Sequence, residues 1–197
     1  HCHTRRQRQM CIRDRIVHRL DKDTSGIMVI SKSEISYLNL IEQLKERSVK
    51  RTYLAIVLGA PLANKIINKP IGRHPKIRTK QAVTHNGKEA ITRFSVLESL
   101  EGYSLLRVNL ETGRTHQIRV HLSHIGYPIV GDPVYGNRSK FSPGSNEAFK
   151  KVISSFKRQA LHAEEIELIH PSSKELISFK ASMPSDMQTL LDDIKNR

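Results

Sequence analysis

The order of hydrophobic and polar residues predicts a chain of short strands interrupted by a few helices. An apolar run over residues 27–30 indicates one buried strand, and the β-branched and aromatic residues of 51–58 indicate a second. Further strands are predicted at 64–71, 81–85, 89–97, 103–111, 163–169 and 175–181. In 103–111, Leu106, Val108 and Leu110 alternate with polar residues, as in a strand with one buried face.

Three segments carry the spacing and end signals of helices. Residues 34–47 place Ile35, Leu38, Ile41 and Leu44 at three-residue intervals, with acidic residues early and basic residues late, as suits the helix dipole. A second helix is predicted over 115–125, where Gly126 ends it. A third begins at 184–185.

The way these elements follow one another predicts the fold class. Most strands succeed each other through turns, and the Asn-Gly pair at 86–87 predicts a hairpin between 81–85 and 89–97. We therefore predict an α+β fold with a mixed, mostly antiparallel central sheet and flanking helices. Residues 137–146 are polar and form a loop, and no repeat or linker divides 16–197 into two domains. Residues 1–15 lack apolar periodicity, and we expect them to be a non-native or disordered segment.

The net positive charge of the chain indicates a class of partner. The formal net charge is +14 and the pI is about 10.0, and leaving out 1–15, with five Arg and one Asp, still leaves 14 − 4 = +10. An excess of this size favours a polyanion, and nucleic acid is the usual one. No stretch approaches the roughly 20 apolar residues that span a bilayer, so we expect a cytoplasmic protein without membrane contact. No apolar stripe is left over for an interface, and we expect a monomer.

Two sets of side chains contain zinc-ligand types but lack zinc spacing. They are His1, Cys2, His3 and Cys11 near the N-terminus, and His116, His121 and His124 in the second predicted helix. The first set matches no zinc pattern, and the second does not lie on one helix face. We therefore expect no metal site.

The nine residues 18–26, HRLDKDTSG, place one acid on a tight loop before a strand. Asp21 lies between Arg19 and Lys22, and Thr24 follows in the turn. A lone Asp at such a place is more often a turn residue than a catalytic one. The flanking cations, which suit an anionic ligand, favour a functional acid here.

A second motif, LETGRTHQIRVH over 110–121, turns from a strand into a helix. The first helical turn is rich in donors and is a candidate anion site; these donors are Arg114, Thr115, His116 and Gln117. Arg119 lies one turn further and could pair with Asp21, which would keep that carboxylate ionised. The alternative is that Arg119 is an ordinary surface residue.

Three shorter segments carry further candidates. Tyr53 lies in the predicted strand RTYLA, where a tyrosine usually packs in a core. The string VGDPVYG contains Asp132, which we interpret as an Asp-Pro turn residue rather than a second catalytic acid. The loop 73–80 carries four cations that suit RNA-backbone contacts, or else form a solvated loop; they are Arg73, Lys76, Arg78 and Lys80.

Taken in order, these strings resemble the motifs of the RluA-type pseudouridine synthases. HRLD, RTYLA, ETGRTHQIR, VGDPVYG and RQALHA (158–163) all match, and with RHPxxR they are most similar to the RluD-like branch, which modifies large-subunit ribosomal RNA. The resemblance implies the pseudouridine synthase catalytic fold over 16–197, incomplete at its N-terminus. It implies an RNA isomerase acting on ribosomal RNA, with tRNA as a further possible substrate. Because this isomerisation consumes no electrons and no water, the resemblance implies no cofactor.

The resemblance also implies roles for individual residues. Asp21 would be the essential acid, as nucleophile at the sugar or the base or as general base on the ribose, Tyr53 would stack on the base, and Arg119 would hold Asp21 charged. The residues expected to bind substrate are His18, Arg19, Thr24, Arg114, Thr115, His116, Gln117, Arg158, Leu161 and His162. The alternative function is a non-catalytic RNA-binding or ribosome-assembly module. A nuclease would require clustered acids or paired histidines for metal, which the sequence lacks.

Overall fold

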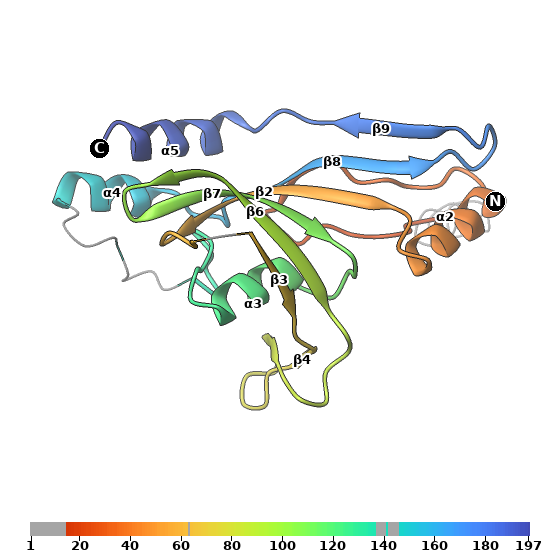
Figure 1. Ribbon diagram of the computed structural model, residues 1–197, viewed down its shortest axis with the longest axis horizontal. Helices are drawn as coiled ribbons and strands as arrows, with labels where there is room; N and C mark the ends of the chain where they lie inside the picture. Colours follow the sequence, from red (N-terminus) through yellow and green to blue (C-terminus); the bar gives the residue numbers. More distant parts are fainter. Residues whose placement is uncertain (1–14, 63, 137–140, 142–145) are drawn as a thin grey trace, which may run out of the picture.

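The computed structural model describes residues 15–62, 64–136, 141 and 146–197, and its main element is a seven-stranded sheet (Figure 1). The strands run in the order β1-β8-β2-β7-β6-β3, and β9 pairs directly with β8, along a later part of β8 than β1 does. Their bounds are β1 Ser25–Gly26, β2 Lys50–Leu58, β3 Lys65–Asn68, β6 Ile91–Leu100, β7 Tyr103–Leu110, β8 Leu161–Ile169 and β9 Leu176–Lys180. β1 and β8 are parallel, whereas the other named pairs are antiparallel. The predicted α+β fold with a mixed, mostly antiparallel sheet is confirmed.

Helices flank this sheet on one face and at both ends (Figure 1). They are α2 Glu34–Lys45, α3 Gln117–His124, α4 Glu147–Ser155 and α5 Ser185–Lys195. The sequence analysis predicted α2, α3 and α5 but not α4. The Asn146 side chain caps α4 by accepting a hydrogen bond from the N–H of Phe149 at 2.8 Å, and Phe149 and Ile153 bury its inner face.

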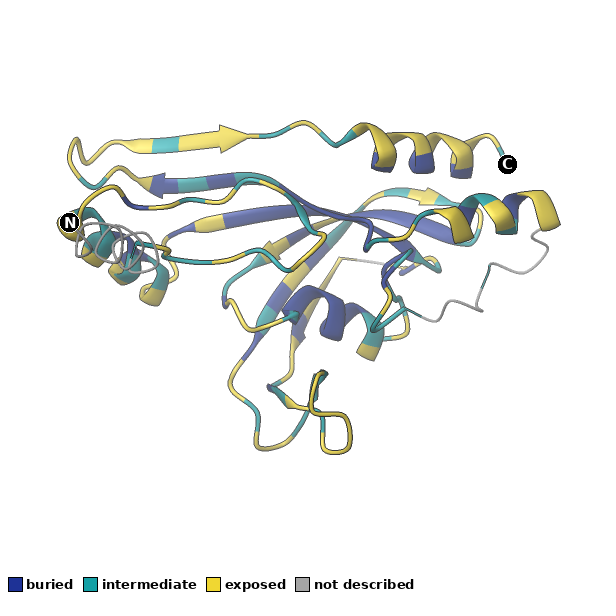
Figure 2. Cartoon of the chain, turned by 180° about the vertical axis from the view of Figure 1, so that it is seen from behind, coloured by how far each residue is buried: buried dark blue, intermediate teal, exposed yellow. Residues whose placement is uncertain are grey.

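The core is built around β2, because β7 and β8 cover both of its edges. Residues 51–57 are buried without interruption, and Ile56 is wholly excluded from solvent. Leu106 from β7 and Leu122 from α3 join the same hydrophobic cluster, each contributing about 1.5–3 kcal/mol by burial. Figure 2 shows the contrast between these buried central strands and the exposed β9.

The predicted strand at 27–30 is wrong in its position. The strand pairing lies two residues earlier, in β1, and a single bridge joins Ile30 to Ile16. Ile27 and Val29 pack against a second small core, whereas Met28 and Ile30 are exposed, so only alternate residues of the apolar run are buried. Gly26 has φ +113°, and a Cβ there would lie 2.2 Å from the carbonyl oxygen of Ala163, so only glycine permits this close strand approach.

Helix α2 is confirmed, but not the buried face expected for it. Ile35 and Leu38 are 80% and 60% exposed, whereas Leu40 and Gln43 are buried. Three-residue spacing turns the helix by about 300°, so each successive position falls about 60° behind the last. A run of four such positions therefore spreads around the helix instead of forming one stripe.

The predicted strand at 64–71 is interrupted, and the predicted hairpin at 86–87 is wrong. Pro70, which has no N–H to donate, separates β3 from β4 Ile71–Arg73. β5 Gln81–Val83 pairs with β4 rather than β6, so the basic loop lies at the tip of the β4–β5 hairpin. This hairpin projects from the sheet (Figure 1). The predicted segments 1–14 and most of 137–146 lie outside the described residues.

Candidate active site

Asp21 lies in a tight turn that a distant part of the chain holds closed. The N–H of Thr24 donates to the Asp21 carbonyl at 3.1 Å, and Asp23 has the left-handed φ of 67° that the turn requires. The buried Gln159 amide, which precedes β8, donates to the Lys22 carbonyl at 2.6 Å and to Thr24 Oγ1 at 2.9 Å. The position of the acid therefore depends on the docking of β8.

Arg119 connects Asp21 to a second carboxylate. Its Nη1 lies 3.2 Å from Asp21 Oδ2, as the sequence analysis expected. Its Nε and Nη2 bond Asp132 Oδ2 and Oδ1 at 2.7 and 3.0 Å. Arg119 and Asp132 are almost fully buried, whereas the Asp21 side chain keeps 17% exposure. Asp21 is therefore the acid of this triad that a ligand can reach.

Asp132 has a role beyond the predicted Asp-Pro turn. Its Oδ1 accepts hydrogen bonds from the N–H groups of Val134 and Tyr135 at 2.8 and 2.9 Å, so the turn interpretation is confirmed. Burial raises the pKa of Asp132, but hydrogen bonds from Arg119 and from the Tyr135 N–H lower it by more, to below its ordinary value. Asp132 thus remains ionised and orients Arg119 toward Asp21.

His116 stands beside Asp21 in a strained backbone conformation. It precedes α3 with φ 56°, and its Nδ1 lies 2.8 Å from the Tyr135 hydroxyl. The Tyr135 ring packs against the Arg119 guanidinium, 5.0 Å from the ring centre. Burial lowers the pKa of His116, and the negative charge of Asp21 opposes this shift. A neutral imidazole is therefore favoured at the rim of the site.

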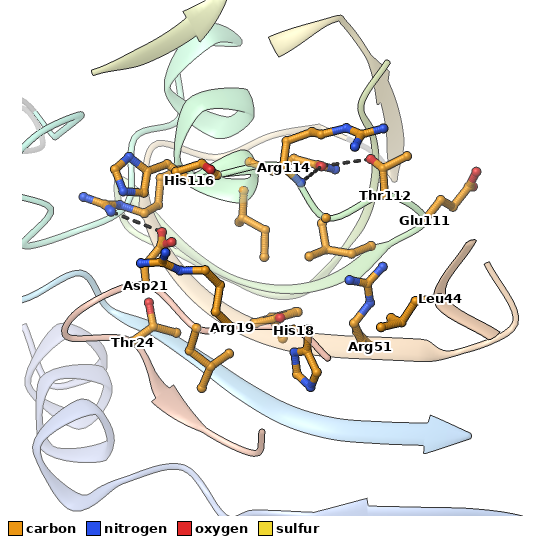
Figure 3. A pocket seen from close by; sticks show the side chains of 18 of the residues that line it. His18, Arg19, Asp21, Thr24, Leu44, Arg51, Glu111, Thr112, Arg114 and His116 are labelled. Carbon is orange, nitrogen blue, oxygen red and sulfur yellow. Dashed lines mark hydrogen bonds and ion pairs between the residues drawn. The ribbon is translucent and has the colours of Figure 1, made fainter. Parts of the chain in front are cut away.

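Asp21, Arg119 and His116 line one pocket of about 500 Å³ (Figure 3). Its lining includes most of the residues predicted for the site, namely His18, Arg19, Asp21, Thr24, Tyr53, Arg114, Thr115, His116, Gln117, Arg119 and Leu161. Tyr53 and Leu161 come from the neighbouring strands β2 and β8, so they supply an apolar floor near Asp21. The pocket continues along β2 toward Arg51 and Leu44 of α2 (Figure 3).

Three of the predicted residues have structural partners. Arg158 pairs with Asp186 at 2.7 and 2.8 Å and, like the buried His162, does not line the pocket. His162 Nδ1 lies 3.0 Å from Ser25 Oγ, which fixes β1. Gln117 does line the pocket, but its amide bonds inward to the Thr112 and Thr92 hydroxyls and the N–H of Arg114, so it shapes the turn before α3.

The basic hairpin is attached to the loop that carries Asp132. Lys80 Nζ donates to the Val134 carbonyl at 2.8 Å, and the N–H of Gln81 donates to the Tyr135 hydroxyl at 2.9 Å. The other predicted cations, Arg73, Lys76 and Arg78, are exposed and lie outside the pocket. The hairpin is thus positioned to extend the surface beside the pocket.

Two further residues in the pocket wall have shifted pKa values. Burial, and then the positive charge of Arg51, lowers the pKa of His18 from 6.5 to about 4. His18 Nε2 accepts a hydrogen bond from the N–H of Val29 at 3.0 Å, which fits a neutral ring. Burial also raises the pKa of Tyr53, so its hydroxyl remains protonated at neutral pH.

The described residues contain neither a metal-binding cluster nor a helix that could span a membrane. Within 15–62, 64–136, 141 and 146–197, no three His, Cys, Asp or Glu side chains gather closely enough to bind a metal ion. In the same ranges, no helix has the length and apolar content needed to cross a bilayer. The N-terminal set of Cys and His considered for zinc lies outside the described residues.

Comparison with known proteins gives a consistent result. The sequence profile described as RNA pseudouridylate synthase matches residues 5–124, which includes part of the segment set aside from the fold prediction. The chain is 46% identical over 180 residues to the "Ribosomal large subunit pseudouridine synthase D" of Xanthomonas campestris, covering 91% of this chain and 54% of that protein. The protein of the same name from Nitrosomonas europaea is 49% identical over 181 residues, covering 92% and 51%. The chain thus spans about half the length of these curated relatives.

Solved structures agree on the fold. "Human RNA Pseudouridylate Synthase Domain Containing 4" superposes with a TM-score of 0.73 and 25% identity, covering 91% of this chain and 75% of that one. "Human RNA Pseudouridylate Synthase Domain Containing 1" gives 0.69 and 28%, covering 85% and 68%. The resemblance read from the motifs is therefore confirmed at the levels of sequence and fold.

Proposed function

This chain belongs to the RNA pseudouridylate synthase family, and on that premise we propose that it isomerises uridine to pseudouridine in RNA. The observation that carries the proposal is the Asp21–Arg119 pair, which lies in one pocket with Tyr53 and Leu161. An ionised acid beside an apolar floor is suited to a flat, neutral base and its ribose. We assign this activity to a catalytic domain of residues 16–197.

The reaction breaks the N1–C1′ bond of uridine and forms a C5–C1′ bond, while one proton leaves C5 and one is gained at N1. It consumes no electrons and no water, so side chains of the protein can carry it without a redox cofactor or a hydrolytic metal. Asp21 acts as nucleophile at the sugar or the base, or as general base on the ribose. All three roles require a carboxylate that is ionised and reachable, and the Arg119 contact together with the partial exposure of Asp21 supports both conditions.

The remaining pocket residues hold the substrate during this exchange. The target must leave its stack to reach a site in a pocket, and the detached uracil must be retained until it rejoins the sugar. Tyr53 stacks on the base, Leu161 forms a wall, and Arg19, which is exposed at the rim, fills the space left in the RNA helix. Arg114, Thr115 and His116 face the same pocket and contact the nucleotide.

Large-subunit ribosomal RNA is the substrate we propose, with tRNA as a second one to test. The printed name of the bacterial relatives supports the first choice. The net charge of +14 and the exposed cations Arg73, Lys76 and Arg78 on the β4–β5 hairpin support backbone contacts to either RNA. We propose that the protein acts as a monomer in the cytoplasm, where both RNAs are present.

The test is pseudouridine formation in ribosomal RNA transcripts and tRNA, read by chemical mapping, for the parent chain and Asp21→Asn. We expect product from the parent and none above background from Asp21→Asn, which lacks the ionised acid, while both proteins bind RNA. Full activity of Asp21→Asn would refute the assignment. RNA binding by both proteins with product from neither would instead favour the non-catalytic RNA-binding or ribosome-assembly module.

A further inference from the structure

The far end of the pocket contains a buried cation that the proposed chemistry at Asp21 does not use. Arg51 is only 8% exposed, and its Nε is buried without a hydrogen-bond partner. Its guanidinium extends from β2 toward the turn that carries Thr112 and Arg114 on the opposite wall (Figure 3). Because Arg51 lines the pocket, the terminal nitrogens of its guanidinium can meet an anion that enters there.

The two acids among the lining residues are engaged by other arginines. Glu111 pairs with Arg93 of β6, and Asp21 pairs with Arg119. In the described part of the chain, no ion pair includes Arg51, and the neutral His18 ring cannot neutralise its charge. The turn also leaves room for the guanidinium, because a Cβ on Gly113 would lie 2.8 Å from Arg51 Nη1.

The position of Arg51 relates it to the base site. Arg51 and Tyr53 are two residues apart on β2 and line the same pocket, so they lie about 6.6 Å apart along the strand. That separation is comparable to one nucleotide step in extended RNA. A guanidinium binds phosphate through two parallel N–H···O bonds, and the terminal Nη1 and Nη2 of Arg51 can supply them.

We propose that Arg51 binds the backbone phosphate of a nucleotide adjoining the uridine in the pocket. The proposal rests on the proposed function, since it takes RNA as the ligand. It divides the pocket into a base site at Asp21, Tyr53 and Leu161 and a phosphate site at Arg51. The phosphate site reads no sequence; it fixes which nucleotide of a strand is presented to Asp21.

The test uses a pentaribonucleotide, AAUAA, in which one backbone phosphate at a time is replaced by an uncharged methylphosphonate. Binding is measured by calorimetry in the Asp21→Asn background, so that the uridine is not converted. One linkage should weaken binding by at least about tenfold when neutralised, the loss expected for a charge-assisted hydrogen bond. In Arg51→Gln the same replacement should change binding less than twofold, and Arg51→Lys should give an intermediate loss.

Lys50→Gln is the matched control, because it removes one positive charge from the neighbouring position of β2. Lys50 is exposed, pairs with Glu167 and does not line the pocket, so the linkage effect should persist in full. The proposal fails if no linkage shows a loss that depends on Arg51, or if Lys50→Gln abolishes the effect as Arg51→Gln does.

Should Arg51→Gln fail to fold, Gly113→Ala provides an independent arm. The three atoms nearest to its new Cβ all belong to the Arg51 guanidinium, so we expect the guanidinium to move while the backbone stays. Loss of the linkage effect is expected, and an unchanged effect would overturn the proposal. Because binding is measured without turnover, a linkage effect in a chain that makes no pseudouridine would count against the proposed function alone.

Discussion

Replacing Asp132 tests the buried part of the Asp21–Arg119–Asp132 triad. Asp132 receives two hydrogen bonds from Arg119 and two from backbone N–H groups, and both charged side chains are almost fully buried. Removing one partner of a buried pair typically costs about 3–5 kcal/mol, since the other charge remains buried. We therefore expect Asp132→Ala to lower the free energy of unfolding by that amount, or the melting temperature by about 6–20 °C at this chain length.

Asp132→Asn distinguishes the cost of losing the ion pair with Arg119 from the cost of losing the hydrogen bonds of the turn. Asp132→Asn retains an oxygen that can accept the N–H groups of Val134 and Tyr135 but loses its charge toward Arg119. Two backbone hydrogen bonds are worth about 1–3 kcal/mol together, so Asn should be less destabilising than Ala by that difference. Urea unfolding at pH 7 is the assay. The pKa of Asp132 lies below its ordinary value, so its contribution is present above about pH 4 and is lost as the pH falls through the folded-state pKa.

The chain contains a matched control at its surface. Asp186 and Arg158 form the same two-bond geometry, at 2.7 and 2.8 Å, but the Asp186 side chain is 49% exposed. Asp186→Ala should cost no more than about 1 kcal/mol, as exposed pairs do. Equal costs for Asp132→Ala and Asp186→Ala, both below about 1 kcal/mol, would refute the reasoning that burial makes the Arg119–Asp132 pair critical.

Two further outcomes follow from the pocket wall. Burial lowers the pKa of His18 to about 4, against about 6.5 in the unfolded chain, so the stability that this neutral ring contributes is complete above pH 6.5 and declines toward pH 4. NMR titration of the ring tests this pKa, and a midpoint near 6.5 would contradict it. His18→Gln should flatten the pH dependence of the free energy of unfolding in this range. Tyr53 is 7% exposed within the main core, so Tyr53→Ala should cost about 3–5 kcal/mol, whereas Tyr53→Phe should preserve stability and isolate the hydroxyl's part in turnover. A loss of stability in Tyr53→Phe comparable to that in Tyr53→Ala would be inconsistent with a packing role for the ring.

The parts of the site that the sequence could predict are those carried by continuous motifs. Asp21 and Arg119 are 98 positions apart, yet their opposite charges within two recognisable strings were enough to expect their contact. Two contacts were not predicted: the hydrogen bonds of Gln159 to the Asp21 turn and the ion pair of Asp132 with Arg119. Neither a glutamine before a strand nor an aspartate before a proline indicates such a distant partner from its local sequence. Their roles depend on which segments pack together in space.

The fold shows the same division between local and long-range information. The end signals of α3 and α5 were strong enough to place both helices, and alternation was sufficient for β7. The pairing of β5 with β4 was missed for two reasons. The Asn-Gly signal at 86–87 favours pairing with the next segment of the chain, and the break at Pro70, which makes β4 a separate strand, was not predicted. Apolar residues in α2 were assigned to the wrong face because four positions at three-residue spacing fit several faces of a helix.

The parallel pairing of β1 with β8 also constrains when the protein can work during its own synthesis. Ser25 pairs with His162, so 137 residues must be made between the Asp21 turn and the strand that holds it closed. At about 5–20 residues per second, roughly 7–27 s pass between the two events. During synthesis, the basic β4–β5 hairpin is therefore complete before β8 is available to hold the Asp21 turn in place. The β4–β5 hairpin ends at Val83, 162 − 83 = 79 residues before His162, so its basic residues are made roughly 4–16 s before the Asp21 turn can close.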